Sequence, residues 1–142
     1  MKDLINKLIA LVDNQFVKAL ALLGARIALA APFWFSARTK VEEGTLLTLN
    51  DVQVLIFENE FGMPYPEIAA PIAMYAEHLF PILLILGLGT RFAAAGLFVM
   101  TLVIQMVFPD AFWTVHLYWF ALAGILIAHG GGLLSADKLV WK

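Results

Sequence analysis

Residues 74–81 read MYAEHLFP and lie within an otherwise almost wholly apolar run over residues 66–88. A helix of that length spans about 30 Å, the thickness of a bilayer's hydrocarbon core, so we expect Glu77 and His78 near the membrane midplane. An ionisable group there costs roughly 2.5–3.5 kcal/mol or more, and it therefore needs to face the protein interior beside a partner. Pro81 lacks the N–H that would bond the Glu77 carbonyl oxygen, which predicts a bend. The stretch predicts a membrane bundle organised around a buried acid.

Composition indicates a single membrane domain over residues 1–142. Of the 142 residues, 62% are hydrophobic and 14% charged, against about 45–50% and about 25% in soluble domains. The net charge is −2 without a Lys/Arg cluster, so nucleic acid is not an expected partner. The absence of cysteine excludes disulfides, thiolate metal sites and Cys nucleophiles within this chain. We expect no removed signal peptide, because no small-residue cleavage site follows a clean apolar core.

Four apolar segments predict four membrane spans. We place them at about residues 16–35, 66–88, 92–108 and 112–129. Before them, an apolar stripe recurs at helical spacing and predicts an N-terminal amphipathic helix at the membrane surface. The stripe consists of Leu4, Ile5, Leu8, Ile9 and Val12. The expected fold is therefore an all-α, integral membrane four-helix bundle, with the bilayer as its surroundings.

The long connection between the first two spans, residues 41–65, is acidic but partly apolar. Thr48 or Asn50 can cap a helix through about Phe61, which Gly62 and Pro64 would stop. We expect this helical loop to lie across the bundle mouth. At the other end of the chain, residues 130–132 are glycines that end the last span, and residues 135–137 are expected to cap a final short turn.

The positive charges predict the orientation. Four spans place both termini on one side, where six Lys or Arg residues fall, against two on the opposite side. The six are Lys2, Lys7, Lys18, Arg91, Lys138 and Lys142, and the two are Arg38 and Lys40. The positive-inside rule then predicts cytoplasmic termini in a bacterial inner membrane, with the acidic connection outside.

Arg26 and Glu77 lie near the middle of the first two expected spans and can meet in one layer. An Arg–carboxylate pair is the least costly way to keep both charges there. It would serve either as a proton or ligand site or as a structural pair that fixes helix register. His78 points about 100° around the helix from Glu77, so it would bond a neighbouring span or join a second part of the pocket.

A second polar layer is expected nearer the outer face. Gln105 lies about one turn before the third span ends, His116 about one turn into the fourth, and Lys40 at the outer mouth. With Trp113 and Tyr118 they can line a pocket for a polar head group such as a quinone carbonyl, with His116 as donor or proton acceptor. The alternative is that His116 is a satisfied interfacial histidine among aromatic side chains.

The remaining polar side chains have simpler interpretations. Arg91 is expected to be a structural charge that anchors the bundle at head-group level. The three histidines and nearby methionines invite a copper site, but they fall on different spans and depths, so we expect no metal site. They are His78, His116, His129, Met74 and Met100. No ligand set for haem, flavin or an iron–sulfur cluster is evident, so no intrinsic cofactor is expected.

The order of several short motifs resembles the DoxX family of small four-span membrane proteins. These are Arg26, a polar exit ending in Lys40, Phe61-Gly62-Met63-Pro64, Ala76-Glu77, residues 86–91 (LGLGTR) and residues 130–137 (GGGLLSAD). The chain departs from the family pattern at Ser36, where relatives often have Gly, and at Gly131, where they often have Pro. Residues 108–116 resemble a branch often encoded beside metal- or oxidative-stress proteins. The resemblance implies that Arg26, Lys40, Glu77 and Arg91 are recurrent charged positions.

Two functions follow as hypotheses. The resemblance implies the membrane subunit of a redox or stress-response system, such as a quinone-linked oxidoreductase, which binds a quinone-like or other small amphiphile within the bundle. A partner protein would then hold the redox centre, and whether this chain is itself an enzyme stays open. The alternative is a non-enzymatic membrane scaffold or permeation element in metal or oxidative stress. Either function is compatible with a homo-oligomer.

Overall fold

Four helices have the length and hydropathy needed to cross a bilayer, as the sequence predicts. The computed structural model describes residues 2–140, apart from the side chains of residues 8 and 10–12. The spanning helices are α2 (Gln15–Thr39), α4 (Pro66–Leu86), α5 (Thr90–Val107) and the composite segment Pro109–His129. No strand occurs within residues 2–140. The all-α membrane fold is therefore confirmed.

Helix α2 is longer than the predicted span, because it continues beyond residue 35 to Thr39. Its start is fixed by Asn14, whose Oδ1 accepts the Val17 N–H at 2.9 Å. Pro32 lies inside the helix without ending it. The extra turn carries Ser36 and brings Lys40 to the C-cap position.

Helix α4 holds the stretch around Glu77 and has sharply defined ends. Pro66 is the first residue of α4. The N–H groups of a helix's first turn have no intrahelical acceptor, so the N–H that proline lacks costs no hydrogen bond at this position. Gly87 ends the helix with a φ of 68°, a left-handed conformation that favours glycine. The helix is continuous through Pro81, so the proline does not break it.

The last span begins irregularly. A 3₁₀ turn, η1 (Pro109–Ala111), leads into a π-helical turn, η2 (Phe112–His116), before α6 (Leu117–His129). A π-turn shifts the side chains around the helix axis, and such turns recur at functional sites. His116 is the last residue of this turn.

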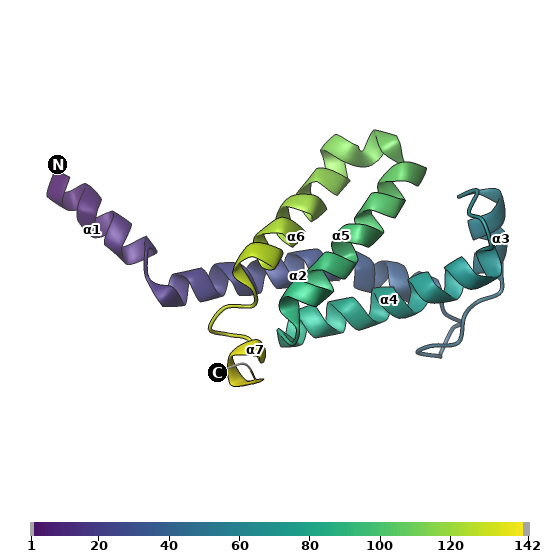
Figure 1. Cartoon of the computed structure of the whole chain (residues 1–142), viewed down its shortest axis with the longest axis horizontal. Helices are drawn as coiled ribbons and strands as arrows, with labels where there is room; N and C mark the ends of the chain where they lie inside the picture. The colour runs from purple at the N-terminus through teal and green to yellow at the C-terminus, as the bar shows by residue number, and fades with distance from the viewer. Residues whose placement is uncertain (1, 141–142) are drawn as a thin grey trace.

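The four spans form two helical hairpins that diverge at one end (Figure 1). Helix α2 packs mainly against α4, and α5 mainly against α6. The common core contains alanines that allow close helix approach, together with larger apolar side chains. The buried core residues are Leu29, Ala30, Phe33, Leu84, Ala93, Ala94, Leu97, Ala123 and Leu126.

The outer faces of the spans are apolar and exposed. Only 17% to 33% of the most hydropathic window of each spanning helix is buried inside the protein. Side chains such as Ile72, Phe92 and Val99 are 62%, 67% and 57% exposed. Contiguous apolar surface of this kind needs lipid as its solvent.

The connection between α2 and α4 folds over the end of the bundle opposite the chain termini (Figure 1). Val41 and Leu49 form an antiparallel bridge, and α3 (Val52–Asn59) follows. The N-cap residue of α3 is Asp51, which makes no side-chain cap bond, so neither Thr48 nor Asn50 is the N-cap as predicted. Asn50, one residue earlier, does accept the Val52 N–H through its Oδ1 at 3.0 Å. The helix ends at Asn59, slightly before the expected Phe61, and its Phe57 is buried.

The N-terminal helix α1 (Lys2–Val12) extends away from the bundle (Figure 1). Three of its expected apolar residues, Leu4, Ile5 and Ile9, are exposed. The side chains of Leu8 and Val12, which complete the predicted stripe, lie outside the described part of the chain.

The segment after α6 returns to the turn between α4 and α5. The carboxylate of Asp137 accepts the N–H groups of Gly89 and Thr90 at 2.6 and 2.9 Å. Asp137 opens the short helix α7 (Asp137–Val140), yet its side chain caps α5. The expectation that residues 135–137 cap their own turn is corrected by these contacts, because the two free N–H groups of α5 lie within reach.

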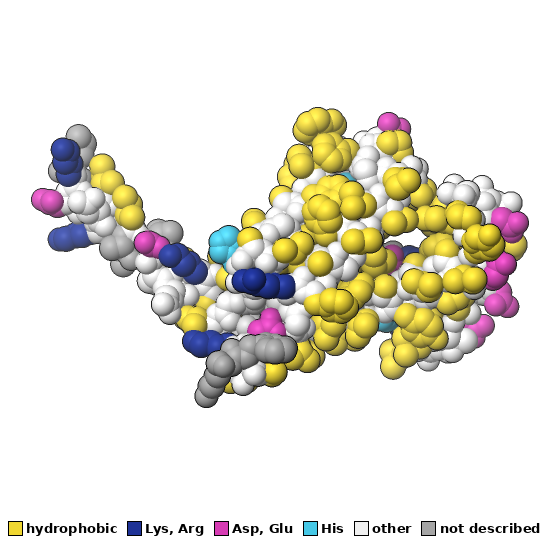
Figure 2. Space-filling model, in the orientation of Figure 1, with side chains coloured by type: hydrophobic (Ala, Val, Ile, Leu, Met, Phe, Trp, Pro, Cys, Tyr) yellow, Lys and Arg dark blue, Asp and Glu magenta, His cyan; other side chains and the backbone are white. Residues whose placement is uncertain are grey.

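Charges separate along the bundle. Figure 2 shows most of the lysine and arginine side chains toward the end that carries α1 and the C-terminus, where a few acidic side chains also lie, and a cluster of acidic side chains at the α3 end. The acidic residues belong mainly to the connection around α3, which contains Glu42, Glu43, Asp51, Glu58 and Glu60.

Candidate functional site

A buried ion pair joins the end of α2 to the middle of α4. Lys40 Nζ lies 2.7 Å from Glu77 Oε2, and the two residues are 7% and 3% exposed. Lys40 follows the last turn of α2, and its side chain runs back along the helix. There Nζ donates to Ser36 Oγ at 2.7 Å and to the Ser36 carbonyl oxygen at 3.4 Å. The ammonium group thus has three acceptors.

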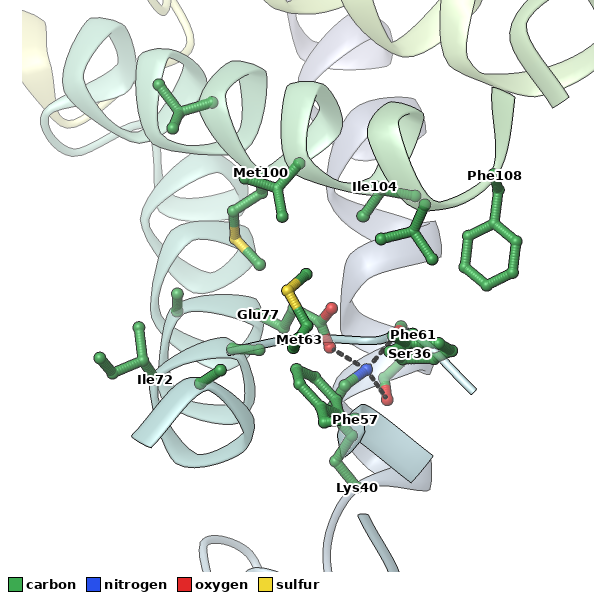
Figure 3. A pocket seen from close by; sticks show the side chains of 16 residues that line it. Ser36, Lys40, Phe57, Phe61, Met63, Ile72, Glu77, Met100, Ile104 and Phe108 are labelled. Carbon is green, nitrogen blue, oxygen red and sulfur yellow. Dashed lines mark hydrogen bonds and ion pairs between the residues drawn. The ribbon is translucent and has the colours of Figure 1, made fainter. Parts of the chain in front are cut away.

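The ion pair lies at the wall of a cavity of about 420 Å³ between α4 and α5 (Figure 3). Apart from Ser36, Lys40 and Glu77, the described residues that line it are apolar. They are Phe57, Phe61, Met63, Ala69, Ile72, Ala73, Ala76, Val99, Met100, Val103, Ile104, Val107 and Phe108. The volume falls within the range of about 300–1,000 Å³ typical of small-molecule sites. The arrangement can bind an apolar molecule that carries one polar group.

The predicted Arg26–Glu77 pair is wrong. Lys40 takes the place expected for Arg26, because α2 is longer than predicted and its Ser36 lies level with Glu77. Residues 26 and 36 are ten positions apart, which corresponds to about 15 Å along a helix. Matching the midpoints of the predicted spans therefore gave the wrong register.

Arg26 instead lies buried at the end of the bundle near the termini. Its Nη1 donates to the Leu84 carbonyl oxygen at 3.3 Å, and its Nη2 donates to the Leu134 carbonyl oxygen at 2.5 Å. The side chain is fully buried. Arg26 therefore ties the end of α4 to the segment after α6.

His78 faces a different part of the bundle from Glu77, as the helical spacing predicts. Its Nδ1 donates to the Met74 carbonyl oxygen at 2.8 Å, and Arg38 Nη1 lies 3.5 Å from its Nε2. Trp34 meets the imidazole edge-on, with ring centroids 5.4 Å apart. His78 thus contacts Arg38 and Trp34 of α2 and does not line the cavity.

Gln105 and His116 form a pair, but they do not share a pocket with Lys40. His116 Nδ1 donates to Gln105 Oε1 at 2.6 Å, while Lys40 lines the cavity without either residue. Trp113 and Tyr118 are 73% and 61% exposed, so they project outward from the bundle. The predicted outer pocket is corrected accordingly: the π-turn η2 directs His116 inward, where it packs against Trp119.

Of the remaining charged and metal-ligating candidates, Met100 lines the cavity, whereas Arg91, Met74 and His129 do not. Arg91 is exposed, and its Nη2 donates to the Ala128 carbonyl oxygen at 3.1 Å. Within the described residues, no three His, Asp or Glu side chains are grouped so that they could hold a metal ion.

Several cavity residues were not singled out from the sequence as a site. Ser36 lies four residues before Lys40, a spacing that places both side chains on the same helix face. Because the first span was predicted to end at about residue 35, this contact was not predicted. Phe61 and Met63 belong to a motif that was recognised, but their position at the cavity depends on the fold of the connection.

The comparisons with known proteins agree with this architecture. The model of the DoxX family matches residues 21–117, a range that includes the ion pair, α3, α4 and α5. No match to the chain was found among curated proteins or solved structures. Because the family match covers more than half of the chain, the protein belongs to the DoxX family.

Proposed function

We propose that the protein binds a small amphiphile, such as a quinone, in the cavity between α4 and α5, as the membrane subunit of a redox or stress-response system. The observation that supports this proposal is the Lys40–Glu77 ion pair at the wall of an otherwise apolar cavity. Buried charges in a membrane are costly and tend to mark functional positions.

The chemistry of the site suits a quinone-like head group. A carbonyl oxygen can accept a hydrogen bond from the Lys40 ammonium if it displaces a Ser36 acceptor, and a hydroxyl group can donate to the Glu77 carboxylate. The apolar lining then holds the rest of the molecule. The redox centre belongs, in this proposal, to a partner protein, since the chain has no cysteine to ligate an iron–sulfur cluster.

We further propose a bacterial inner-membrane location with both termini in the cytoplasm. Positive side chains gather toward the end near the termini, whereas the connection around α3 is acidic (Figure 2). This asymmetry supports the orientation by the positive-inside rule. The cavity, which reaches α3, would then lie in the outer half of the bilayer.

Ligand-induced stabilisation tests the proposal. The purified chain in detergent micelles is heated with increasing mole fractions of decylubiquinone, and a ligand that binds the native state raises the unfolding temperature. We expect a rise for the native protein and none for the double variant Lys40→Met/Glu77→Gln. No rise in the native protein, or an equal rise in the double variant, would contradict the proposal.

A second ion pair provides the matched control. Lys18 and Asp13 pair at the protein surface, with side chains 63% and 65% exposed. The double variant Lys18→Met/Asp13→Asn also removes one positive and one negative charge, but from residues that do not line the cavity. It is expected to respond to decylubiquinone like the native protein.

The scaffold hypothesis is favoured by a different observation, the structural contacts of Arg26 with Leu84 and Leu134. A scaffold needs the bundle but not the charges in the cavity. Complementation of a deletion strain under oxidant stress separates the two functions. The Lys40→Met/Glu77→Gln protein should restore growth if the protein is a scaffold and fail if it acts through a ligand.

A further inference from the structure

The charges of the cavity constrain the head group that it can accept. Lys40 and Glu77 are the charged residues among those described that line it, and they neutralise each other at 2.7 Å. The Lys40 ammonium already has Ser36 Oγ, the Ser36 carbonyl oxygen and Glu77 as acceptors. An anionic head would add an uncompensated negative charge to a water-poor layer, which is strongly unfavourable. The site therefore favours a neutral polar head.

Aromatic side chains cover the end of the cavity that faces the long connection. Phe57 and Phe61 come from α3 and the segment after it, and Phe108 from the end of α5. The rings of Phe61 and Phe108 meet edge-on, with centroids 5.4 Å apart. This contact joins the connection around α3 to the end of α5 at that end of the cavity.

The flank of the cavity between α4 and α5 has an apolar, exposed rim. Ile72 on α4 is 62% exposed, and Val99 and Val103 on α5 are 57% and 41% exposed, although all three line the cavity. Figure 2 shows a hollow bordered by hydrophobic side chains, with charged atoms visible at its base. Side chains that line a cavity and face lipid at once mark its opening to the bilayer.

Small side chains on α4 keep this opening wide. Ala69, Ala73 and Ala76 line the cavity at spacings of three and four residues, so they form one stripe of the helix. The stripe leads toward Glu77, the next residue after Ala76. It leaves room for a chain between α4 and α5.

We infer that the cavity takes a neutral, tailed amphiphile directly from the bilayer through the opening between α4 and α5, with its head at Lys40–Glu77 and its tail toward the lipid. This inference rests on the proposed function for its ligand, but it adds the ligand's charge, its tail and its route. A water-soluble, tail-less or anionic molecule fits the site less well.

Spin labelling tests the route without any ligand. Because the chain has no cysteine, one introduced cysteine carries a nitroxide at a single position in protein reconstituted into vesicles. Ala76→Cys reports on the cavity, Ile85→Cys on the exposed apolar face of α4, and Glu43→Cys on the aqueous connection. Collisions with oxygen indicate lipid access, and collisions with a nickel chelate indicate water access.

We expect the label at position 76 to behave like that at position 85, with oxygen collisions prevailing. Behaviour like that at position 43 would overturn the inferred route. Ala73→Cys provides a second cavity position if the first variant does not yield folded protein. Because no ligand is present, this result stands apart from the outcome of the quinone-binding experiment.

A ligand series tests the tail and the charge. The rise in unfolding temperature is compared at equal mole fractions in micelles for three compounds. They are decylubiquinone, the tail-less 2,3-dimethoxy-5-methyl-1,4-benzoquinone, and decanoate at a pH at which its carboxyl group is ionised. We expect decylubiquinone to act at concentrations at least about tenfold lower than the tail-less ring, a ratio equivalent to about 1.4 kcal/mol, and decanoate to give no shift. Equal action of the tail-less ring, or stronger action of decanoate, would overturn the inferred ligand class. If none of the three compounds raises the unfolding temperature, the result contradicts the proposed function itself.

Discussion

Removing one member of the Lys40–Glu77 pair differs physically from removing both. The single variant Glu77→Gln leaves the Lys40 ammonium buried without its counter-charge, a loss of about 3–5 kcal/mol in comparable pairs. The double variant Lys40→Met/Glu77→Gln removes both charges and is expected to unfold close to the native temperature. Thermal unfolding of the three proteins in one detergent measures this. Equal losses in the single and double variants would show that the two residues do not depend on each other.

Asp137 predicts a pH dependence at the other end of the bundle. Partial burial alone would raise its pKa, but the hydrogen bonds from Thr90 and Gly89, with the nearby Arg26 charge, outweigh that effect and lower the pKa below its ordinary value. A lowered folded-state pKa stabilises the protein above the ordinary value of about 3.9, and that stability is lost as the pH falls through the folded-state pKa.

The corresponding measurement compares the native protein with Asp137→Asn between pH 7 and pH 3. We expect the native protein to unfold at the higher temperature above about pH 5, with the difference shrinking as the carboxylate becomes protonated. A difference that is constant across this range would mean that the Asp137 charge contributes nothing to stability.

Single residues also show where prediction from sequence reached its limit. That Glu77 would be buried beside a cation followed from the cost of a charge in lipid. Which cation it would meet did not follow, because the answer depends on how α2 and α4 are displaced along each other. A lysine that bends back by one turn, as Lys40 does toward Ser36, reaches a layer that its position in the sequence does not suggest.

At the scale of elements, the turn between α4 and α5 combines a required backbone conformation with close packing. Gly87 has a φ of 68°, and a Cβ there would come within 2.0 Å of Arg26 Nη1 and 2.6 Å of Ser135 Cβ. Gly89 has a similar φ of 57°, but a Cβ there would meet nothing within 4 Å. Substitutions at the two glycines therefore distinguish the cost of backbone strain, which both share, from the cost of a packing clash, which only Gly87 adds.

Alanine at each position measures the two contributions. Gly89→Ala should cost about 1–2 kcal/mol, from the left-handed conformation alone. Gly87→Ala should lower the unfolding temperature further, because it also displaces Arg26 or Ser135. The yield of folded protein and its thermal unfolding check this order. Equal effects of the two changes would contradict the close packing of the C-terminal segment against this turn.

The elements themselves were largely predictable. Apolar runs bounded by Pro66, Gly87 and the glycines at 130–132 defined spans whose ends moved by only a few residues, except at Thr39. The π-turn at residues 112–116 and the capping of α5 by Asp137 were not predictable, because both arise from tertiary contacts. The same applies to the aromatic cover over the cavity, which needs the fold of the connection around α3.

Basic side chains prevail at one end of the molecule and acidic side chains at the other, which predicts its orientation in the membrane. In intact spheroplasts, the single-cysteine variant Glu43→Cys should react with a membrane-impermeant maleimide. Lys138→Cys should react only after permeabilisation, because the termini are proposed to be cytoplasmic. Both side chains are exposed, so access is set by the side of the membrane. The reverse pattern would invert the orientation and place the cavity in the inner half of the bilayer.

Photolabelling tests whether the lipid-accessible cavity that contains Lys40 and Glu77 holds the ligand. The reconstituted protein is irradiated with a tailed azidoquinone, and the labelled peptides are identified by mass spectrometry. We predict labelling of residues that line the cavity, such as Met63, Ala73 or Met100, that excess decylubiquinone suppresses. Labelling scattered over the outer faces of α5 and α6, unaffected by decylubiquinone, would show that the ligand does not bind in this cavity.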